Sequence, residues 1–352
     1  MSARRSVSTT APTAALAVLV LSASLAACGS SSDDAAESSA RDRSGAVEDG
    51  LVRWGVASLP TTAYEASFVS VGDLDRASAL AEAERPDGVD DEAGYEDWLD
   101  AVTGVEGSVA LTLPEVLGGY WGEAPDVVAA EIGTSAVTAE RFAELVSAPG
   151  RASVVAGPVD LDALEEAYGP GEEGRWRIGE GQDLSTDLTE RSALRPLGQP
   201  VHVQAEKDLL TAAFVASDLT LALAQDRGDE GALEVAEALD VHEVYVADLV
   251  VGASPGDSRS LPEAFDAVGV GLTGDADAPL VVAYHHASSE EAEANADALA
   301  DVLDADGDAR GFELLETSVD GSVLTATLSL DDLPLSAGRD ALLRRAPFVS
   351  HA

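Results

Sequence analysis

Apolar and polar positions follow a repeating order along the chain: an apolar run, a turn containing Asp or Ser, and a helical pattern rich in Ala and Leu. The apolar runs have the length of buried strands, and each is followed by a helix-capping residue. The strands and the helices that follow them are expected at residues 65–71 with 74–84, 153–156 with 161–168, and 280–285 with 288–303.

Further strands follow the second and third of these units. They are expected at residues 175–178, 201–204 and 209–216, and then at 312–317 and 323–330. The last of them alternates polar with apolar residues, which is typical of a sheet with one face in water. The pattern predicts an α+β fold of antiparallel sheets with helices on one face. It also suggests that a strand–helix–strand–strand unit is duplicated.

The predicted organisation has two halves or domains, at residues 51–216 and 217–330, and a C-terminal tail at 331–352. The second half opens with an amphipathic helix at 230–239 and a buried strand at 244–251.

The beginning of the chain has the three parts of a secretory signal. Arg4 and Arg5 supply the positive charge, and residues 14–25 are apolar but shorter than the about 20 residues of a membrane-spanning helix. Residues 25–28 read Leu-Ala-Ala-Cys, and this cysteine is the only one in the chain. The tetrapeptide resembles the lipobox of bacterial lipoproteins: an aliphatic residue, two small residues and then cysteine.

The resemblance implies that Cys28 is alkylated with diacylglycerol and that the signal peptide, residues 1–27, is removed, leaving an acylated N-terminus. Two or more acyl chains would anchor the protein firmly to the outer face of the cytoplasmic membrane. The polar residues 28–50 would then form a flexible tether. The alternative is an ordinary signal peptide with a chance cysteine. We expect the general secretory route, because the apolar pair that usually follows twin arginines is absent after Arg5.

Composition restricts the partners. The chain has 65 acidic and 20 basic residues, and its formal net charge of −45 repels nucleic acids and anionic lipid surfaces. We therefore expect no nucleic acid partner. Hydrophobic residues make up 46% and aromatic residues 5%, so a core is expected and it must be built mainly from Ala, Val and Leu. A single cysteine excludes an internal disulfide and a cysteine-built metal site.

One motif suggests nucleophilic catalysis. Residues 252–256 read Gly-Ala-Ser-Pro-Gly, follow a predicted strand and match the Gly-x-Ser-x-Gly elbow of α/β-hydrolases, with Ser254 as nucleophile and His285 or His286 downstream. In that family the residue after the serine donates its N–H to the oxyanion hole, whereas Pro255 has no N–H. A simple turn explains the same residues, and we favour it.

Three aspartates suggest a cation site. Asp304, Asp306 and Asp308 alternate as in the first half of a calcium loop, but the positions for the required glycine and glutamate hold Ala309 and Leu315. An EF-hand is excluded, and two alternatives remain open: a weak surface cation site or a polar turn.

The remaining chemistry-bearing residues are few. His285 and His286 are adjacent on a strand and must point to opposite faces, so they cannot chelate one metal together. His202 and His242 are isolated, and no cofactor-binding motif is present. Arg175 and Arg177 flank Trp176 on a strand. They are expected to balance nearby acids or to contact an anion or a carbohydrate.

We expect a non-enzymatic, lipid-anchored binding or interaction module of the cell envelope, whose partner is an envelope protein or a small ligand. The high ratio of Arg to Lys and the abundance of Ala make the body similar in style to uncharacterised secreted lipoproteins of actinobacteria, and this similarity implies no functional residue. The first alternative is a lipid or glycolipid carrier with an apolar cavity, and the second is a serine hydrolase using Ser254.

Overall fold

The computed structural model describes residues 50–352 apart from 105–108, 119–124, 149, 193, 196, 225–227, 253, 306–310 and 332. The predicted signal peptide, Cys28 and all of the tether except Gly50 lie outside the described residues. None of the helices in the described part has the length and apolar character needed to cross a bilayer.

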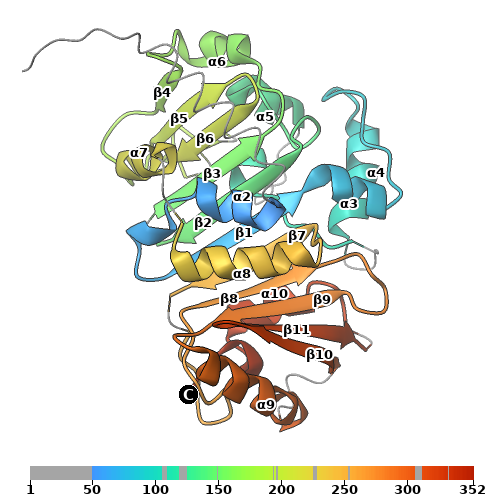
Figure 1. Cartoon of the computed structure of the whole chain (residues 1–352). Coiled ribbons are helices and arrows are strands. Elements are labelled where there is room, and N and C mark those ends of the chain that lie inside the picture. The colour runs from blue at the N-terminus through green and yellow to red at the C-terminus, as the bar shows by residue number, and fades with distance from the viewer. Residues whose placement is uncertain are drawn as a thin grey trace, which may run out of the picture.

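Within the described residues, eleven strands form one fully antiparallel sheet, in the order β10-β11-β9-β8-β7-β1-β2-β3-β6-β5-β4 (Figure 1). The strands are β1 (Ser67–Asp73), β2 (Arg141–Ser147), β3 (Gly150–Ala156), β4 (Arg175–Ile178), β5 (Val201–Glu206), β6 (Leu209–Ala213), β7 (Val246–Val251), β8 (Ala267–Leu272), β9 (Leu280–His285), β10 (Phe312–Asp320) and β11 (Val323–Leu330). The predicted α+β class and antiparallel pairing are confirmed.

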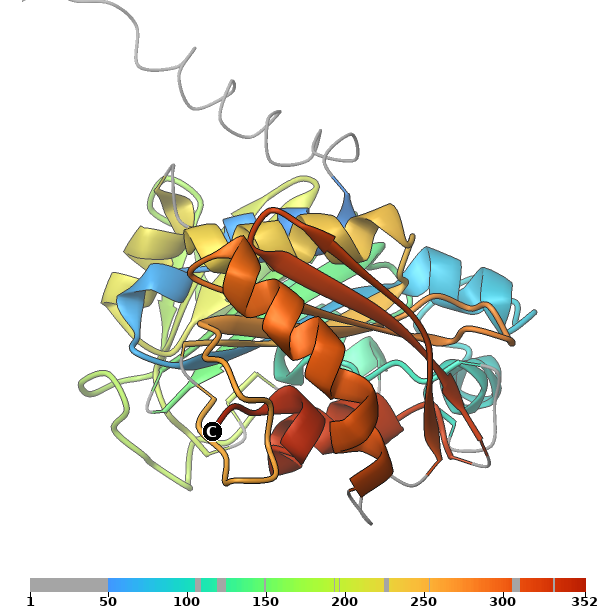
Figure 2. The same ribbon diagram turned by 60° about the horizontal axis from the view of Figure 1, so that its bottom comes forward.

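Helices cover both faces of this sheet. Their bounds are α2 (Leu51–Ser58), α3 (Leu74–Leu80), α4 (Glu92–Thr103), α5 (Pro125–Ile132), α6 (Leu161–Tyr168), α7 (Ala216–Leu223), α8 (Glu230–Val241), α9 (Ser289–Ala305) and α10 (Ala337–Arg344). Short 3-10 helices are η2 (Thr61–Ala63), η3 (Glu115–Leu117) and η5 (Pro347–Val349). We call the side covered by α2, α7 and α8 the α8 face, and the other side the α10 face (Figure 2).

The arrangement differs from the expected single covered face, and the strand composition explains why. The central strands β8 and β9 are apolar at successive positions and are buried almost throughout. A strand that is apolar on both sides must be covered on both sides, as in buried sheets generally. Only the edge strands β10 and β4 alternate between exposed and more buried residues.

The two predicted halves follow the same path and pair into one sheet. In each, a helix (α2 or α8) precedes three antiparallel strands, and a helix (α6 or α9) is followed by a hairpin whose last strand pairs with the third of these strands. The first unit differs in having α3, α4 and α5 between its first two strands and β4 between α6 and the hairpin. Both hairpins, β5 with β6 and β10 with β11, have a two-residue turn. The second to fourth residues of the last strand are Leu-Thr-Ala in both units, at 210–212 in β6 and 324–326 in β11. The shared path and this shared tripeptide support the duplication hypothesis.

The two units meet where β1 pairs with β7 and α2 packs against α8. Asp240, in the last turn of α8, accepts hydrogen bonds from the first amides of α2, those of Val52 (2.8 Å) and Arg53 (2.9 Å). Gly269 and Gly271 let the chain of the second unit pack closely, because a Cβ at these positions would meet Leu239 at 2.9 Å and Val244 at 2.6 Å.

The repeat is broken at its end. After β6, α7 packs on the α8 face, whereas after β11, α10 crosses to the other face and packs on β7 and β8. Residues 331–352, expected as a tail, are therefore part of the body, and Phe348 and Val349 are fully buried. The apolar side chains of α10 and η5 are buried against the sheet for the same reason as those of the strands: their exposure to water would be unfavourable.

Candidate functional site

Ser254 is held in a structural hydrogen bond. It follows β7, is 1% exposed, and its hydroxyl donates to the carbonyl of Val349 at 3.1 Å. The described residues between β7 and β8 contain no helix, although the hydrolase elbow places its serine between a strand and a helix. The geometry agrees with the turn interpretation of this motif.

His285 and His286 point to opposite faces, as expected. The His285 ring contacts Asp266 (2.6 Å) and Glu234 of α8 (3.4 Å). His286 is fully buried between the carbonyl of Ser322 (3.3 Å) and the amide of Asn295 on α9 (2.8 Å). Burial lowers the pKa of His286, so the neutral ring is favoured there.

Asn295 extends this contact into a clasp. Its side chain accepts from the N–H of Glu263 and donates to the carbonyl of the same residue, both at 2.9 Å. The clasp ties α9 to β9 and to the segment before β8. His286 is thus structural, and its ring is separate from the hydroxyl of Ser254.

The other sequence candidates do not converge. Asp304 lies near the end of α9, and Asp306 and Asp308 lie outside the described residues. In the described part of the chain, no three His, Cys, Asp or Glu side chains are grouped so that they could hold a metal. Arg175 and Arg177 are exposed and Trp176 is buried, as the alternation predicted.

A row of polar side chains that the sequence pattern does not predict crosses the centre of the sheet. Asp248 on β7, Ser70 on β1, Glu144 on β2 and Ser153 on β3 are direct neighbours in the strand registers. Each of the four is flanked on both sides by apolar residues of its strand, and this interruption is the local signal that marks it. We call these four residues the central polar row.

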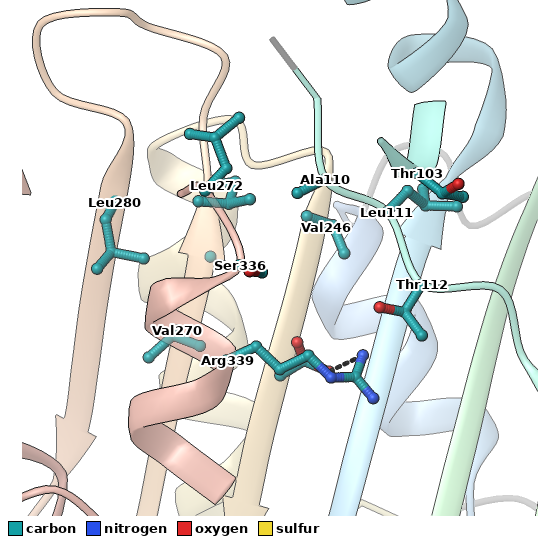
Figure 3. A pocket seen from close by; sticks show the side chains of 13 residues that line it. Thr103, Ala110, Leu111, Thr112, Val246, Val270, Leu272, Leu280, Ser336 and Arg339 are labelled. Atoms are coloured by element: carbon teal, nitrogen blue, oxygen red, sulfur yellow. Dashed lines mark ion pairs between the residues drawn. The ribbon is translucent and has the colours of Figure 1, made fainter. Parts of the chain in front are cut away.

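Arg339 reaches this row from α10. Its Nη1 lies 3.3 Å from Oδ1 of Asp248, to which the Ser70 hydroxyl also donates at 2.5 Å. Figure 3 shows the guanidinium extending from the helix toward the strands, with the ion pair as a dashed line. The helix that breaks the repeat is thus the one that brings a positive charge to the centre of the sheet.

The row is held in surroundings that disfavour ionised carboxylates. Burial raises the pKa of Glu144 to about 7, although the Ser153 hydroxyl and the charge of Arg339 act in the opposite direction. Burial likewise raises the pKa of Asp248, opposed by Arg339 and Ser70. A cavity of about 70 Å³ beside Arg339 has room for a few water molecules. The row can therefore bind and release a proton near neutral pH, but its cavity is too small for an organic ligand.

A larger cavity is bordered by α10, the start of β10 and the segment before β8, and we call it the arginine cavity. It measures about 380 Å³ and is bordered by Arg259, Arg344, Arg345 and Asp340. Its remaining wall is mostly apolar, formed by Phe312, Leu333, Pro334, Ala337, Ala341, Ala346 and Pro347. Volume and lining are those of small-molecule sites, which combine apolar walls with a few polar groups.

The charges of this cavity differ from those of the rest of the chain. Arg259 is paired with Asp257 at 2.9 Å. Within the described residues, the ion pairs include neither Arg344 nor Arg345. Arg345 also has the left-handed backbone (φ 53°) at the end of α10, where glycine is the usual residue.

A third cavity adjoins both of the others, and we call it the leucine cavity. It measures about 260 Å³, and besides Gly274 and the acidic Asp275 its lining is apolar: Tyr245, Leu272, Ala276, Pro279, Leu330, Leu333 and Leu335. Leu333 also lines the arginine cavity, and Leu272 and Leu335 also line the small central cavity. The space around residues 333–336 is therefore a series of neighbouring cavities on the α10 face.

Comparison with known proteins identifies no relative: no family model, no curated protein and no solved structure matches the chain.

Proposed function

We propose that this protein is a lipid-anchored, non-enzymatic binding protein of the cell envelope, and that its ligand site is the arginine cavity. The lipobox resemblance around Cys28 supports the anchor. The expectation of a non-enzymatic role accords with the hydrogen bonds that hold Ser254 and His286 in structural positions.

One observation carries the choice of site. The chain has 65 acidic and 20 basic residues, yet three arginines border a single cavity of about 380 Å³. Two of them, Arg344 and Arg345, form no ion pair with any described acid, whereas Arg259 is paired with Asp257. Clustered cations repel one another, so an anion beside Arg344 and Arg345 would be stabilised by both guanidinium groups. The ligand proposed for this site is therefore anionic.

A second candidate function is lipid carriage, which the leucine cavity favours. The sheet does not enclose a single apolar interior, because buried side chains fill both of its faces. The apolar space that a carrier needs is instead available beside Leu333, next to the arginines.

The anchor is tested by partition between membrane and aqueous fractions. We expect the natural chain to remain with the membrane and to enter the detergent phase, and Cys28→Ser protein to be released. Ser31→Ala, a change in the predicted tether that leaves residues 25–28 intact, is the matched control and should stay with the membrane. Retention of Cys28→Ser protein in the detergent phase would contradict the anchor.

The site is tested by native mass spectrometry of protein purified from its own membrane. We expect a mass that is lost on mild unfolding, in addition to the covalent lipid, and that is missing from an Arg344→Gln, Arg345→Gln double variant. A bound mass that the double variant retains would place the ligand elsewhere.

A further inference from the structure

We propose that the arginine cavity and the leucine cavity together bind one single-chain amphiphile, its anionic head among Arg259, Arg344 and Arg345 and its alkyl chain along Leu333. This inference rests on the proposed function and specifies its ligand.

The head position follows from charge. Among the residues that border the arginine cavity, three carry a positive charge and Asp340 carries a negative one, so the border is net positive in a chain whose overall charge is −45. Arg259 keeps Asp257 as its partner, while no described acid, Asp340 included, lies within ion-pair distance of Arg344 or Arg345. Guanidinium groups match the oxygens of carboxylates and phosphates in pairs, so these two side chains are suited to an anionic head.

A purely structural role accounts for only part of this arrangement. Arg344 lies in the last turn of α10, where a cation stabilises the helix dipole. Stabilising the helix dipole needs only one positive charge and no cavity. It does not explain why a second arginine, Arg345, occupies the following left-handed position, where glycine is the usual residue. Four other described residues besides glycine also have a positive φ, so what distinguishes Arg345 is its place beside Arg344 on the border of the cavity.

The tail position follows from the shape and lining of the cavities. Beyond the arginines the wall is apolar and includes Phe312, Ala337 and Pro347. Leu333 lines both this wall and the leucine cavity of about 260 Å³, whose lining adds Leu330 and Leu335 and, as its one charged residue, Asp275. A small inorganic anion would leave this apolar surface in water, whereas an alkyl chain would bury it, and each buried methylene favours binding.

The inference can be tested with defined probes and the full chain carrying Cys28→Ser, which has no acyl group of its own and needs no detergent. Dodecyl phosphate and dodecanoate, each below its micelle concentration, differ in the head. Inorganic phosphate supplies the head alone, and dodecyltrimethylammonium carries the same tail with the opposite charge. Isothermal titration calorimetry measures the affinity of each probe.

We expect both dodecyl anions to bind, inorganic phosphate to bind at least a hundredfold more weakly, and the cation not to bind. Arg344→Gln and Arg345→Gln should each weaken dodecyl phosphate about tenfold, because each removes a charged hydrogen-bond donor. Leu333→Ser should weaken the dodecyl anions and leave inorganic phosphate unchanged. Arg175→Gln, at an exposed arginine on β4, is the control and should have no effect.

The possible failures are distinguishable. If inorganic phosphate binds as tightly as dodecyl phosphate, the amphiphile is refuted while an anion site remains. If the cationic probe binds equally well, or if the arginine variants bind unchanged, the head assignment is refuted. If none of the anions binds, the arginine cavity is not the ligand site and the site assignment of the proposed function is wrong as well.

Discussion

The central polar row makes a quantitative prediction about stability and pH. The pKa of Glu144 rises from an ordinary value of 4.5 to about 7 in the folded protein, because burial penalises the ionised form. The folded state therefore keeps a proton over a pH range in which the unfolded state has lost it. In that range the free energy of unfolding must fall as the pH rises.

The size of the effect follows from the two pKa values. Their difference corresponds to about 3 kcal/mol of lost stability once the pH exceeds about 7. Roughly 2.5 kcal/mol of this falls between about pH 5 and pH 8, since the loss begins near the ordinary pKa. Water that reaches the carboxylate reduces both figures, so they are upper limits.

Glu144→Gln removes the titration and keeps a carbonyl oxygen for the hydrogen bonds from the Ser153 hydroxyl and the Glu115 amide. We expect this variant to gain stability relative to the natural protein as the pH rises, by about 2.5 kcal/mol from pH 5 to pH 8. Urea unfolding followed by circular dichroism measures the difference at each pH.

Glu293→Gln is the matched control, because it removes an equal charge from an exposed position on α9. The difference between this control and the natural protein should stay nearly constant over the same range. If the difference for Glu144→Gln is equally constant, Glu144 is ionised in the fold at ordinary pH, and the reasoning about its burial is wrong.

Three further changes test other contacts. Arg339→Met leaves Asp248 buried without its cation and should lower the free energy of unfolding, measured with urea, by about 3 kcal/mol. Adding Asp248→Asn to this variant should restore much of the lost stability, and a fully stable Arg339→Met protein would contradict the pairing. Asp240→Ala removes the acceptor for the first amides of α2, so it should lower the free energy of unfolding by about 1–2 kcal/mol and accelerate hydrogen exchange at these amides. Unchanged exchange would show that Asp240 does not cap α2. Asn295→Leu breaks the clasp around His286 and should lower the free energy of unfolding by about 1–3 kcal/mol, and an unaltered imidazole NMR signal would show that the clasp is not formed.

Local pattern was sufficient to predict many of the elements. The helix at 161–168 and the strands at 175–178, 280–285 and 323–330 have the bounds expected from the residues alone. In these segments the apolar period, the capping residue and the turn residues indicate the same structure. The pairing of residues into antiparallel strands and the repeated path of the chain also follow from the order of these elements.

Other elements were missed because their local signals conflict with their structure. β8 contains Gly269 and Gly271, which disfavour a strand in isolation and are required only because side chains of the second unit pack against them. α10 lies within residues 331–352, which the pattern predicts to be a tail. Its burial depends on the sheet surface that β7 and β8 form, and no property of residues 331–352 alone reveals that surface.

The sequence by itself determined the fold class, the acidic character and, at Cys28, the hypothesis of a lipid anchor, because these depend on composition, period and local motifs. Only the tertiary structure decided which chemistry-bearing side chains meet. In the central polar row, the hydrogen-bonded residues Ser70 and Asp248 are 178 positions apart in the sequence. The arginine cavity likewise joins Arg259 to the end of α10. Contacts of this kind depend on strand register and on the face to which a helix packs, and both are set by burial of the whole apolar surface.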